Sequence, residues 1–318
     1  MKALQMVGPR QVAVVDDMPM PEPREGEVLV RTQFSALCGS NMRPYEGTGS
    51  WAGAYPRAAG WDGHETIGTI VESRLDGWDV GTVVLAHPQD YLGFAEFLRA
   101  RPPGLVRLPA EGDVAALMVA QPLSTVLRAL RRVDPVVGKR CVVVGQGPMG
   151  LVFTHLLGRM GARQVIGIDL LAWRLEWARR FGATDVVDAS KDDATEAVRE
   201  LTGGEMADVC VEAAGTVDSV MAAVHLPRRF GTLIVFGVPY HEVQDFPLNR
   251  MFRNELVVVN SVGADCVDYF QNAVDMVVGA RVDLGAMVTP RLPFDQGPRA
   301  FEMYSTHEEG TLKLVLEL

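Results

Sequence analysis

Two residues in the first quarter of the chain carry side chains that suit a metal ion. Cys38 lies in a turn that follows an expected strand, and His64 comes later, in the segment Gly63-His64-Glu65. A cysteine thiolate and a histidine imidazole are both good ligands for Zn²⁺. A catalytic zinc keeps three protein ligands and one open position for water or substrate. A third ligand must therefore come from elsewhere in the chain.

A glycine-rich turn with the sequence GQGPMG occupies residues 145–150. It follows the apolar run of residues 141–144 and opens a helical pattern, which is the context in which a GxGxxG motif binds a dinucleotide. The first glycine permits a tight turn, the second lets a pyrophosphate approach the backbone, and the third lets helix and strand pack closely. The helix N-terminus offers free N–H groups to the phosphates. The residues expected at this cofactor site are Gly145, Gly147, Pro148, Met149 and Gly150.

An acidic residue, Asp169, ends the next expected strand, roughly 20 residues after the turn. Its carboxylate can accept hydrogen bonds from both ribose hydroxyls and would repel a 2′-phosphate, so the sequence predicts NAD in preference to NADP. Arg174, one helical turn further on, could belong to the cofactor site and soften that preference, or could be a solvated helix charge. The competing interpretation of the motif is a turn needed only for packing, with Asp169 in solvent.

The elements that must position these residues change in type near residue 113. Before it, alternating apolar patterns predict strands over residues 28–32, 68–72 and 81–85, and few windows have a helical period. This pattern is typical of a small antiparallel β unit. From residue 113, apolar residues at helical spacing predict helices over 114–118 and 123–130, and Pro122 could open the second of them.

Strict alternation of strands and helices follows residue 138. The expected helices cover residues 150–160 and 171–181, and the expected strands cover residues 141–144, 165–169, 185–187, 208–211, 232–236 and 256–259. Continuous apolar strands separated by helices indicate a parallel sheet covered on both faces. The fold class predicted for the chain is therefore α/β, with a β-rich unit joined to a doubly wound Rossmann unit.

The tail of the chain returns to a mixed pattern after residue 261. A helix over residues 267–278, a strand near 287–289 and a strand over 312–316 are expected there. These elements have no complete core of their own, so we expect them to join the first unit. The predicted domains are residues 1–122 with 266–318, and residues 123–265 as the dinucleotide-binding domain.

The bulk composition sets limits on function. A chain of 318 residues suits two domains, and 48% hydrophobic with 22% charged residues is typical of a globular protein. The net charge of -10 argues against a general nucleic-acid binder. No apolar run reaches the roughly 20 residues that span a bilayer, and the start of the chain lacks a signal-peptide pattern. Four scattered cysteines form no disulfide framework, which favours a reducing cytoplasm; they are Cys38, Cys141, Cys210 and Cys266.

Several further segments occur in one order with these motifs. The full set comprises Cys38-Gly39-Ser40, Gly63-His64-Glu65, Gly93-Phe94-Ala95-Glu96-Phe97, Gln121-Pro122-Leu123, the GxGxxG turn, Glu212-Ala213-Ala214-Gly215 and Phe301-Glu302. This order resembles the zinc-containing medium-chain dehydrogenases, particularly the sorbitol, threonine and glucose dehydrogenase branch. The similarity extends over nearly the whole chain. It implies a groES-like catalytic domain combined with a Rossmann domain.

The resemblance implies a zinc site and its ligands. Cys38 and His64 would be ligands, and Glu65 would lie beside the metal, as a ligand itself or through water. The branch commonly has a further ligand in a Glu-Pro-Leu segment, and Gln121 stands at that position here, as in some sugar dehydrogenases of the family. Taken singly, each residue has an ordinary structural interpretation, such as a buried cysteine or a solvated carboxylate. The ordered set favours metal binding.

Three departures from the family pattern affect this site. The lobe with four cysteines that often holds a structural zinc is absent, because residues 85–93 contain no cysteine, and one catalytic zinc per chain is therefore expected. His87, in that shortened segment, is interpreted as a loop residue. Asn41 stands where the branch usually has aspartate, which puts the usual polar network in doubt. Trp61-Asp62 extends the segment before the histidine, so the pocket wall should differ.

The resemblance implies reversible oxidation of a secondary alcohol, with NAD as hydride acceptor. Ser40 would be the first member of a proton relay, and catalysis would rest on Ser40 together with Cys38, His64 and Glu65. Polar residues at 41, 43, 45 and 46 suggest a polyol, cyclitol or sugar as substrate. A homo-oligomer, dimer or tetramer, is expected. The competing hypotheses are a zinc-free quinone or enoyl reductase of the same fold and a non-catalytic protein that retains the fold.

Overall fold

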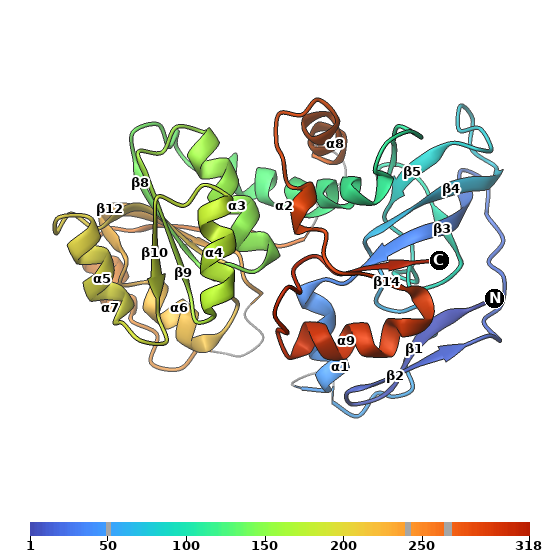
Figure 1. The fold of residues 1–318 in the computed structure, drawn as a ribbon, viewed down its shortest axis with the longest axis horizontal. Coiled ribbons are helices and arrows are strands. Elements are labelled where there is room, and N and C mark those ends of the chain that lie inside the picture. The colour runs from blue at the N-terminus through green and yellow to red at the C-terminus, as the bar shows by residue number, and fades with distance from the viewer. Residues whose placement is uncertain (49–51, 239–242, 264–268) are drawn as a thin grey trace. The chain divides into compact units, whose positions relative to one another are not determined.

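The computed structural model of the chain describes residues 1–48, 52–238, 243–263 and 269–318. It divides into two compact units. The first consists of Met1–Ser124 with Asp265–Leu318, and the second consists of Thr125–Ala264. Each unit contains its own sheet (Figure 1). No helix among the described residues is long and apolar enough to cross a membrane.

The first unit is built on a seven-stranded sheet in the order β14-β15-β3-β4-β5-β7, with β6 also pairing with β3. The strands of this sheet are β3 (Val28–Ala36), β4 (Thr66–Ser73), β5 (Val83–Ala86), β6 (Phe97–Ala100), β7 (Leu105–Arg107), β14 (Arg291–Pro293) and β15 (Val315–Glu317). The pairs β3–β4, β4–β5 and β5–β7 are all antiparallel. The expected antiparallel β unit is therefore present. The late strand β15 pairs with β3, so the tail belongs to this sheet.

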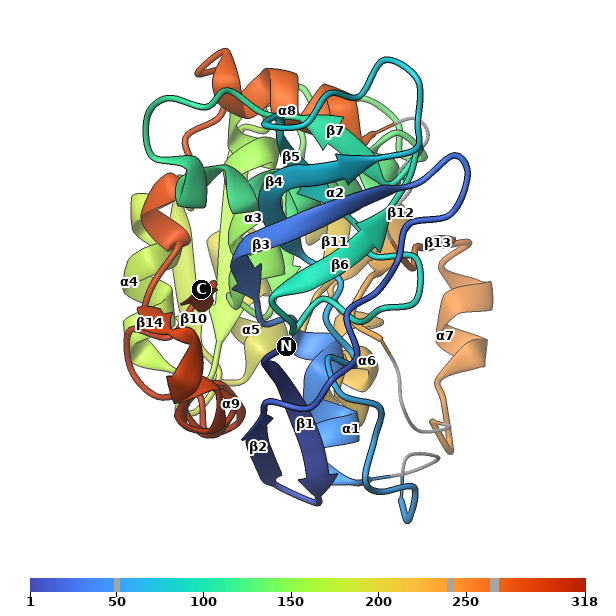
Figure 2. The same cartoon turned by 90° about the vertical axis from the view of Figure 1, so that its right-hand side faces the viewer.

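A separate hairpin and several helices complete the first unit. The hairpin consists of β1 (Ala3–Gly8) and β2 (Gln11–Val15), and the α-helices are α1 (Met42–Glu46), α8 (Phe270–Val278) and α9 (Gly297–Ser305). The helix α2 (Ala120–Leu130) begins in the first unit and ends in the second, because the division falls after Ser124. Short 3₁₀ segments are η1 (Gly39–Asn41), η3 (Val114–Val119), η4 (Gly285–Met287) and η5 (Phe294–Gln296). Figure 2 shows α1 and α9 gathered beside the hairpin at one end of the unit. The aromatic rings of Tyr45, Phe94 and Phe301 pack together there in a buried cluster.

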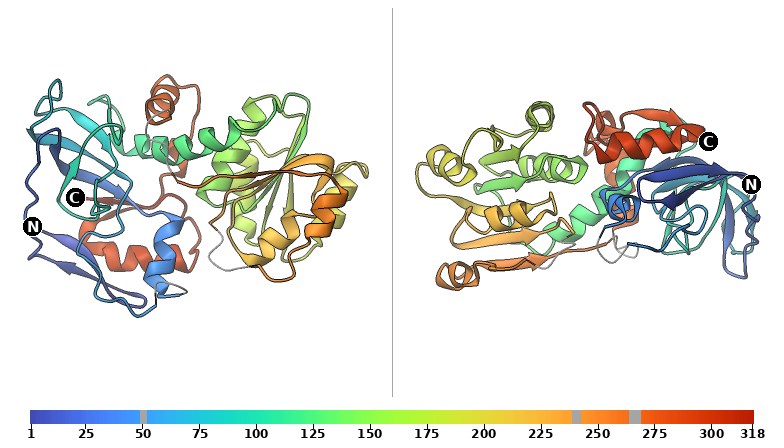
Figure 3. Two further views of the ribbon diagram at one scale, coloured as in Figure 1. Left: turned by 180° about the vertical axis from the view of Figure 1, so that it is seen from behind. Right: turned by 90° about the horizontal axis from the view of Figure 1, so that it is seen from below.

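The second unit is a six-stranded parallel sheet in the order β10-β9-β8-β11-β12-β13. Its strands are β8 (Arg140–Val144), β9 (Gln164–Asp169), β10 (Asp185–Asp188), β11 (Ala207–Glu212), β12 (Pro227–Val235) and β13 (Val257–Asn260). Its helices are α3 (Pro148–Arg159), α4 (Ala172–Arg180), α5 (Ala194–Leu201), α6 (Val217–Ala223) and α7 (Leu248–Arg253). Helices flank both faces of the sheet (Figure 3). The strand order reverses between β8 and β11, which is where such folds bind a dinucleotide. The predicted α/β fold class is confirmed.

One predicted element is wrong. Residues 287–289 do not form a strand: Met287 ends the 3₁₀ segment η4, and the strand β14 begins only at Arg291. The apolar residues suggested an extended segment, but Pro290 has no N–H to give to a ladder and follows directly. The backbone of this segment still receives hydrogen bonds from the C-terminal run, including one from Lys313 N to Met287 O at 2.9 Å.

Candidate active site with a metal centre

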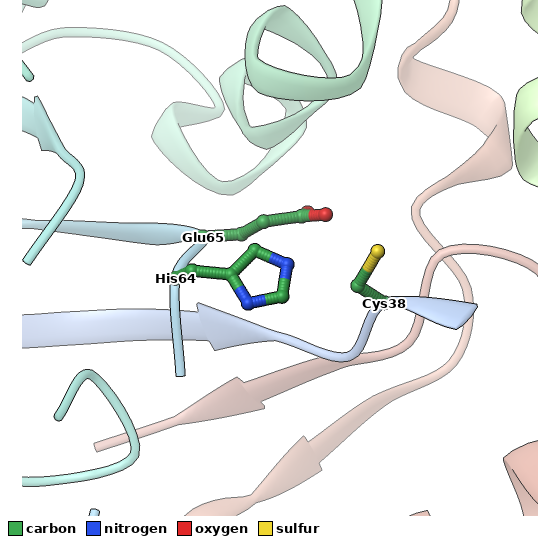
Figure 4. A group of neighbouring side chains, drawn as sticks. All are labelled: Cys38, His64 and Glu65. Atoms are coloured by element: carbon green, nitrogen blue, oxygen red, sulfur yellow. The ribbon is translucent and has the colours of Figure 1, made fainter. Parts of the chain in front are cut away.

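The side chains of Cys38, His64 and Glu65 meet at one end of the β3–β4 pair. Ser35 of β3 is paired with Thr66 of β4, so the residues that follow β3 lie beside those that precede β4. One ligand atom from each side chain (the thiol sulfur, an imidazole nitrogen and a carboxylate oxygen) lies within 4.8 Å of the other two. Figure 4 shows the three side chains converging on one region. Sulfur, nitrogen and oxygen donors in this number fit a catalytic zinc.

The ring of His64 is held in one orientation. Its Nδ1 donates to the carbonyl oxygen of Asp62 at 2.9 Å and lies 3.6 Å from a carboxylate oxygen of the same residue. That leaves Nε2 as the nitrogen free to bind a metal ion, since the protonated nitrogen of a ligating histidine is normally fixed by such an outer contact. The hydroxyl of Ser40 lies 3.5 Å from Nε2. The structure therefore brings Ser40 to the site.

Electrostatics in this cluster favour a bound cation. Burial lowers the pKa of His64, but the nearby carboxylates and the Cys38 sulfur raise it, and the resulting pKa is well above the usual value. Desolvation and the Glu65 carboxylate raise the pKa of Cys38, yet His64 and a neighbouring ammonium group lower it by more, so its pKa falls. The Cys38 thiolate is thus favoured. The negative surroundings that hold a proton on His64 would equally attract a metal ion in its place.

A buried lysine, which sequence reasoning missed, forms an ion pair with Glu65. The ammonium group of Lys313 contacts the Glu65 carboxylate and also donates to the carbonyl oxygen of Leu37 at 3.0 Å. Both side chains of the pair are almost fully buried. The only available signal was a single lysine in the apolar run of residues 312–316. The attraction of the Lys313 ammonium group offsets part of the cost of burying the Glu65 carboxylate next to the metal position.

Gln121, the remaining predicted ligand, is the second residue of α2 and is buried. Its backbone carbonyl accepts a hydrogen bond from the Ser124 hydroxyl at 2.6 Å. Its role as a ligand stays a prediction.

The glycine turn has the conformation that cofactor binding needs. Gly145 has a φ of +88°, and a Cβ at Gly150 would lie 1.7 Å from the carbonyl oxygen of Gly145. Other residues are therefore excluded at both positions. Gly147 is the N-cap of α3, and Pro148 opens that helix. Met149 and Gly150 follow in the first turn of α3, where backbone N–H groups have no partner within the helix and can bind phosphate, whereas Pro148 has no N–H to offer.

Asp169 lies at the end of β9, beside the glycine turn. One carboxylate oxygen accepts from Gln146 N at 2.6 Å and the other from Leu171 N at 2.9 Å. The guanidinium of Arg174 is 3.9 Å from Asp169, and only 14% of the Arg174 side chain is exposed. Arg174 is therefore not the solvated helix charge of the simpler interpretation. Arg174 also borders the glycine turn, because a Cβ placed on Gly147 would lie 3.8 Å from a nitrogen of the Arg174 guanidinium.

Two family models match the chain. Residues 24–126 match the alcohol dehydrogenase GroES-like domain, and residues 148–279 match the zinc-binding dehydrogenase model. The first match includes Cys38, His64 and Gln121, and the second begins within the glycine turn. The chain belongs to the zinc-containing medium-chain dehydrogenases. Zinc and a nicotinamide dinucleotide are therefore its cofactors.

Relatives of this medium-chain dehydrogenase match over almost their full length. A zinc-type alcohol dehydrogenase-like protein of Haemophilus influenzae is 28% identical, with 98% of this chain and 97% of the relative covered. The sorbitol dehydrogenase of Ovis aries is 26% identical, over 91% of this chain and 89% of the relative. Among solved structures, alcohol dehydrogenase TADH from Thermus sp. ATN1 has a TM-score of 0.89 at 23% identity, with 100% of both chains covered. That likeness supports the fold.

The shortened segment of this dehydrogenase brings two more rings toward the metal cluster. His87 and Tyr91 follow β5, and their ring centroids are 5.0 Å apart. The rings of His87 and Tyr91 lie 6.3 Å and 6.2 Å from that of His64. His87 is thus a loop residue, as expected, but one that neighbours the site. Its pKa is lowered by burial and by His64.

The polar residues expected to face the substrate occupy other places in this dehydrogenase. Tyr45 is buried with its ring against Phe301, 5.3 Å between centroids. Glu46 pairs with Arg10 at 3.5 Å. Asn41 is fully buried. The hypothesis of a hydroxylated substrate therefore gains no support from Tyr45, Glu46 or Asn41. Its support is the likeness to other members of the family.

Proposed function

We propose that this protein oxidises a secondary alcohol, of the polyol, cyclitol or sugar type, to a ketone and transfers the hydride to NAD. The observation that carries the proposal is the convergence of Cys38, His64 and Glu65 in a chain that also has a complete dinucleotide turn. The first unit would be the catalytic domain and the second the NAD-binding domain. We place their boundaries near residues 122 and 266.

The chain's own residues divide the chemistry. Zinc, when bound by Cys38, His64 and one or both of Glu65 and Gln121, would supply a Lewis acid for the alcohol oxygen. Ser40 would accept the hydroxyl proton and pass it toward solvent, because its hydroxyl lies beside the metal-binding nitrogen of His64. The nicotinamide ring, when a dinucleotide is bound at the glycine turn, would supply the acceptor for the hydride from the alcohol carbon. One proton and one hydride leave, which balances oxidation of the alcohol to the ketone.

The cofactor preference would follow from Asp169. A carboxylate at the end of β9 accepts ribose hydroxyls and repels a 2′-phosphate. Arg174 lies close enough to offset part of that repulsion. We propose that NAD remains the better cofactor, because both oxygens of Asp169 are fixed by backbone N–H groups while Arg174 is at ion-pair distance only.

One zinc per chain and a homo-oligomer complete the proposal. Among the described residues, the cluster at Cys38 is the group with the donors and spacing of a metal site. In the second unit, β13 is the edge strand of the sheet. The segment of residues 252–262, which includes β13, has exposed apolar side chains at Phe252, Val257 and Val262. An unpaired strand edge with exposed apolar side chains is suited to pairing with a second copy.

The direct test is turnover of a panel of alcohols and polyols with NAD, before and after removal of zinc. We expect NADH formation with at least one secondary alcohol, loss of activity on chelation and recovery on adding zinc. Cys38→Ser should lose both zinc and activity. Undiminished reduction of a quinone or an enone by NADPH in the chelated protein would instead favour the zinc-free reductase hypothesis.

A further inference from the structure

The amide of Asn41 joins the two segments that carry the metal ligands. Its Oδ1 accepts from the backbone N–H of Cys38 at 2.8 Å. Its Nδ2 donates to the carbonyl oxygen of Asp62 at 2.9 Å and lies 3.5 Å from one carboxylate oxygen of Asp62. The Asn41 side chain is fully buried, so both ends of the amide are used without water. Position 41 therefore needs one acceptor and one donor.

The other carboxylate oxygen of Asp62 faces His64. It lies 3.6 Å from Nδ1 of the ring, and the backbone carbonyl of the same residue accepts the Nδ1 proton at 2.9 Å. Within the described residues, the structure shows no lysine or arginine paired with Asp62. The negative charge of Asp62 is therefore directed at the imidazole and at the amide of Asn41.

A carboxylate at position 41 would conflict with this arrangement. Aspartate there could not donate to Asp62, and two carboxylates about 3.5 Å apart would repel strongly at a site with little water. This chain has a neutral asparagine at position 41, directly beside the acidic Asp62. Asn41 and Asp62 are thus in direct contact, and the neutral amide allows the carboxylate to lie next to it.

We propose that Asp62 is the residue that positions His64 for metal binding, and that Asn41 is the neutral partner that holds Asp62 in place. This inference rests on the proposed zinc site. A carboxylate behind a ligating histidine fixes the ring and makes it a stronger ligand, and loss of such a partner typically reduces metal affinity about 10- to 100-fold.

The first test compares the zinc affinity of the wild-type holoenzyme with that of Asp62→Asn, by competition with a chromophoric chelator. The substitution keeps the backbone carbonyl that accepts from His64 and from Asn41 and removes only the charge. We expect zinc affinity to fall about 10- to 100-fold, with the thermal stability of the metal-free protein unchanged. Asp79→Asn is the matched control, because Asp79 is exposed and the substitution removes the same charge.

The second test uses the exchange of the two residues. Asn41→Asp alone should weaken zinc binding, because it places two carboxylates together. The double variant Asn41→Asp/Asp62→Asn should bind zinc more tightly than Asn41→Asp, because one charge and one amide face each other again. In cobalt-substituted protein, the visible absorption bands should shift in Asp62→Asn and return toward wild type in Asp62→Glu.

The outcomes separate this inference from the proposed function. If Asp62→Asn binds zinc as tightly as Asp79→Asn while Cys38→Ser has lost zinc, the positioning role is wrong and the zinc site stands. If the exchange variant binds zinc no better than Asn41→Asp, the charge conflict is wrong. A wild-type protein that binds no zinc would overturn both this inference and the proposed function.

Discussion

The buried pair of Lys313 and Glu65 makes the strongest stability prediction. Lys313→Met keeps an unbranched side chain of similar size but leaves the Glu65 carboxylate buried without the ammonium group that it contacts. Breaking a buried ion pair in this way typically costs about 3–5 kcal/mol. The carbonyl oxygen of Leu37 also loses its hydrogen bond from the ammonium group, worth about 0.5–1.5 kcal/mol. Together these losses amount to about 3.5–6.5 kcal/mol. We expect them to lower the unfolding temperature of the first unit of the metal-free protein by about 7–26 °C.

Three comparisons isolate the cause of that loss. The double variant Lys313→Met/Glu65→Gln removes both charges and should recover most of the stability, since a neutral buried pair has no uncompensated charge. Zinc-loaded Lys313→Met should be less destabilised than the metal-free form, because the cation lies near the same carboxylate. Lys2→Met breaks an exposed pair with Asp295 and should change little. The assay is calorimetric melting with and without zinc. A metal-free Lys313→Met protein as stable as wild type would refute the reasoning.

The remaining predictions concern the cofactors and the thiols. The kcat/KM with NAD should exceed that with NADP by at least roughly tenfold, because about 1.4 kcal/mol of charge repulsion gives that factor. Asp169→Ala should lose the preference. Equal kcat/KM values for the two cofactors in the wild type would mean that Asp169 does not decide the choice. Elemental analysis should give about one zinc per chain. Gln121→Ala should lose zinc to a chelator faster than wild type, and Gln121→Glu should retain it longer but turn over more slowly; zinc retention in Gln121→Ala equal to wild type would remove Gln121 from the ligands. Peptide mapping after alkylation near neutral pH should find Cys38 modified only in the metal-free protein, since the pKa of its thiol is lowered. Cys141 and Cys210 should stay unmodified, because burial raises the pKa of both thiols, that of Cys141 to about 12.

Much of the fold follows from periodicity, because it depends on residues close in sequence. The strand β9 and the helix α4, for example, differ from their predicted ranges by only one residue at an end. The strand expected over residues 287–289 failed because a local apolar pattern cannot show that the backbone there turns before Pro290. The cysteines illustrate a different limit. Cys141 and Cys210 are buried in strands, as simple core residues, and Cys266 lies outside the described residues.

The grouping of Cys38, His64 and Glu65 could be predicted from the sequence, but the partners of these side chains could not. Cys38 and His64 belong to motifs with recognisable residue types. Asp62 was visible only as an extension of a segment, and its contact with Asn41 depends on the pairing of two strands. Contacts of this kind are decided by the sheet register, which no short motif specifies.

The charge balance of the site depends on a contact between distant parts of the chain. The ladder of β3 and β4 suffices to bring Cys38 near His64. Among the described residues, the Glu65 carboxylate forms its ion pair with Lys313, which also contacts Leu37, 276 residues away in sequence. Pairing of the C-terminal segment with β3 therefore supplies the positive charge that offsets part of the cost of burying the carboxylate. Since zinc would bind the assembled site and not the unfolded chain, metal binding should stabilise this pairing. Zinc retention thus reports whether the C-terminal segment is docked, as well as whether the ligands are present.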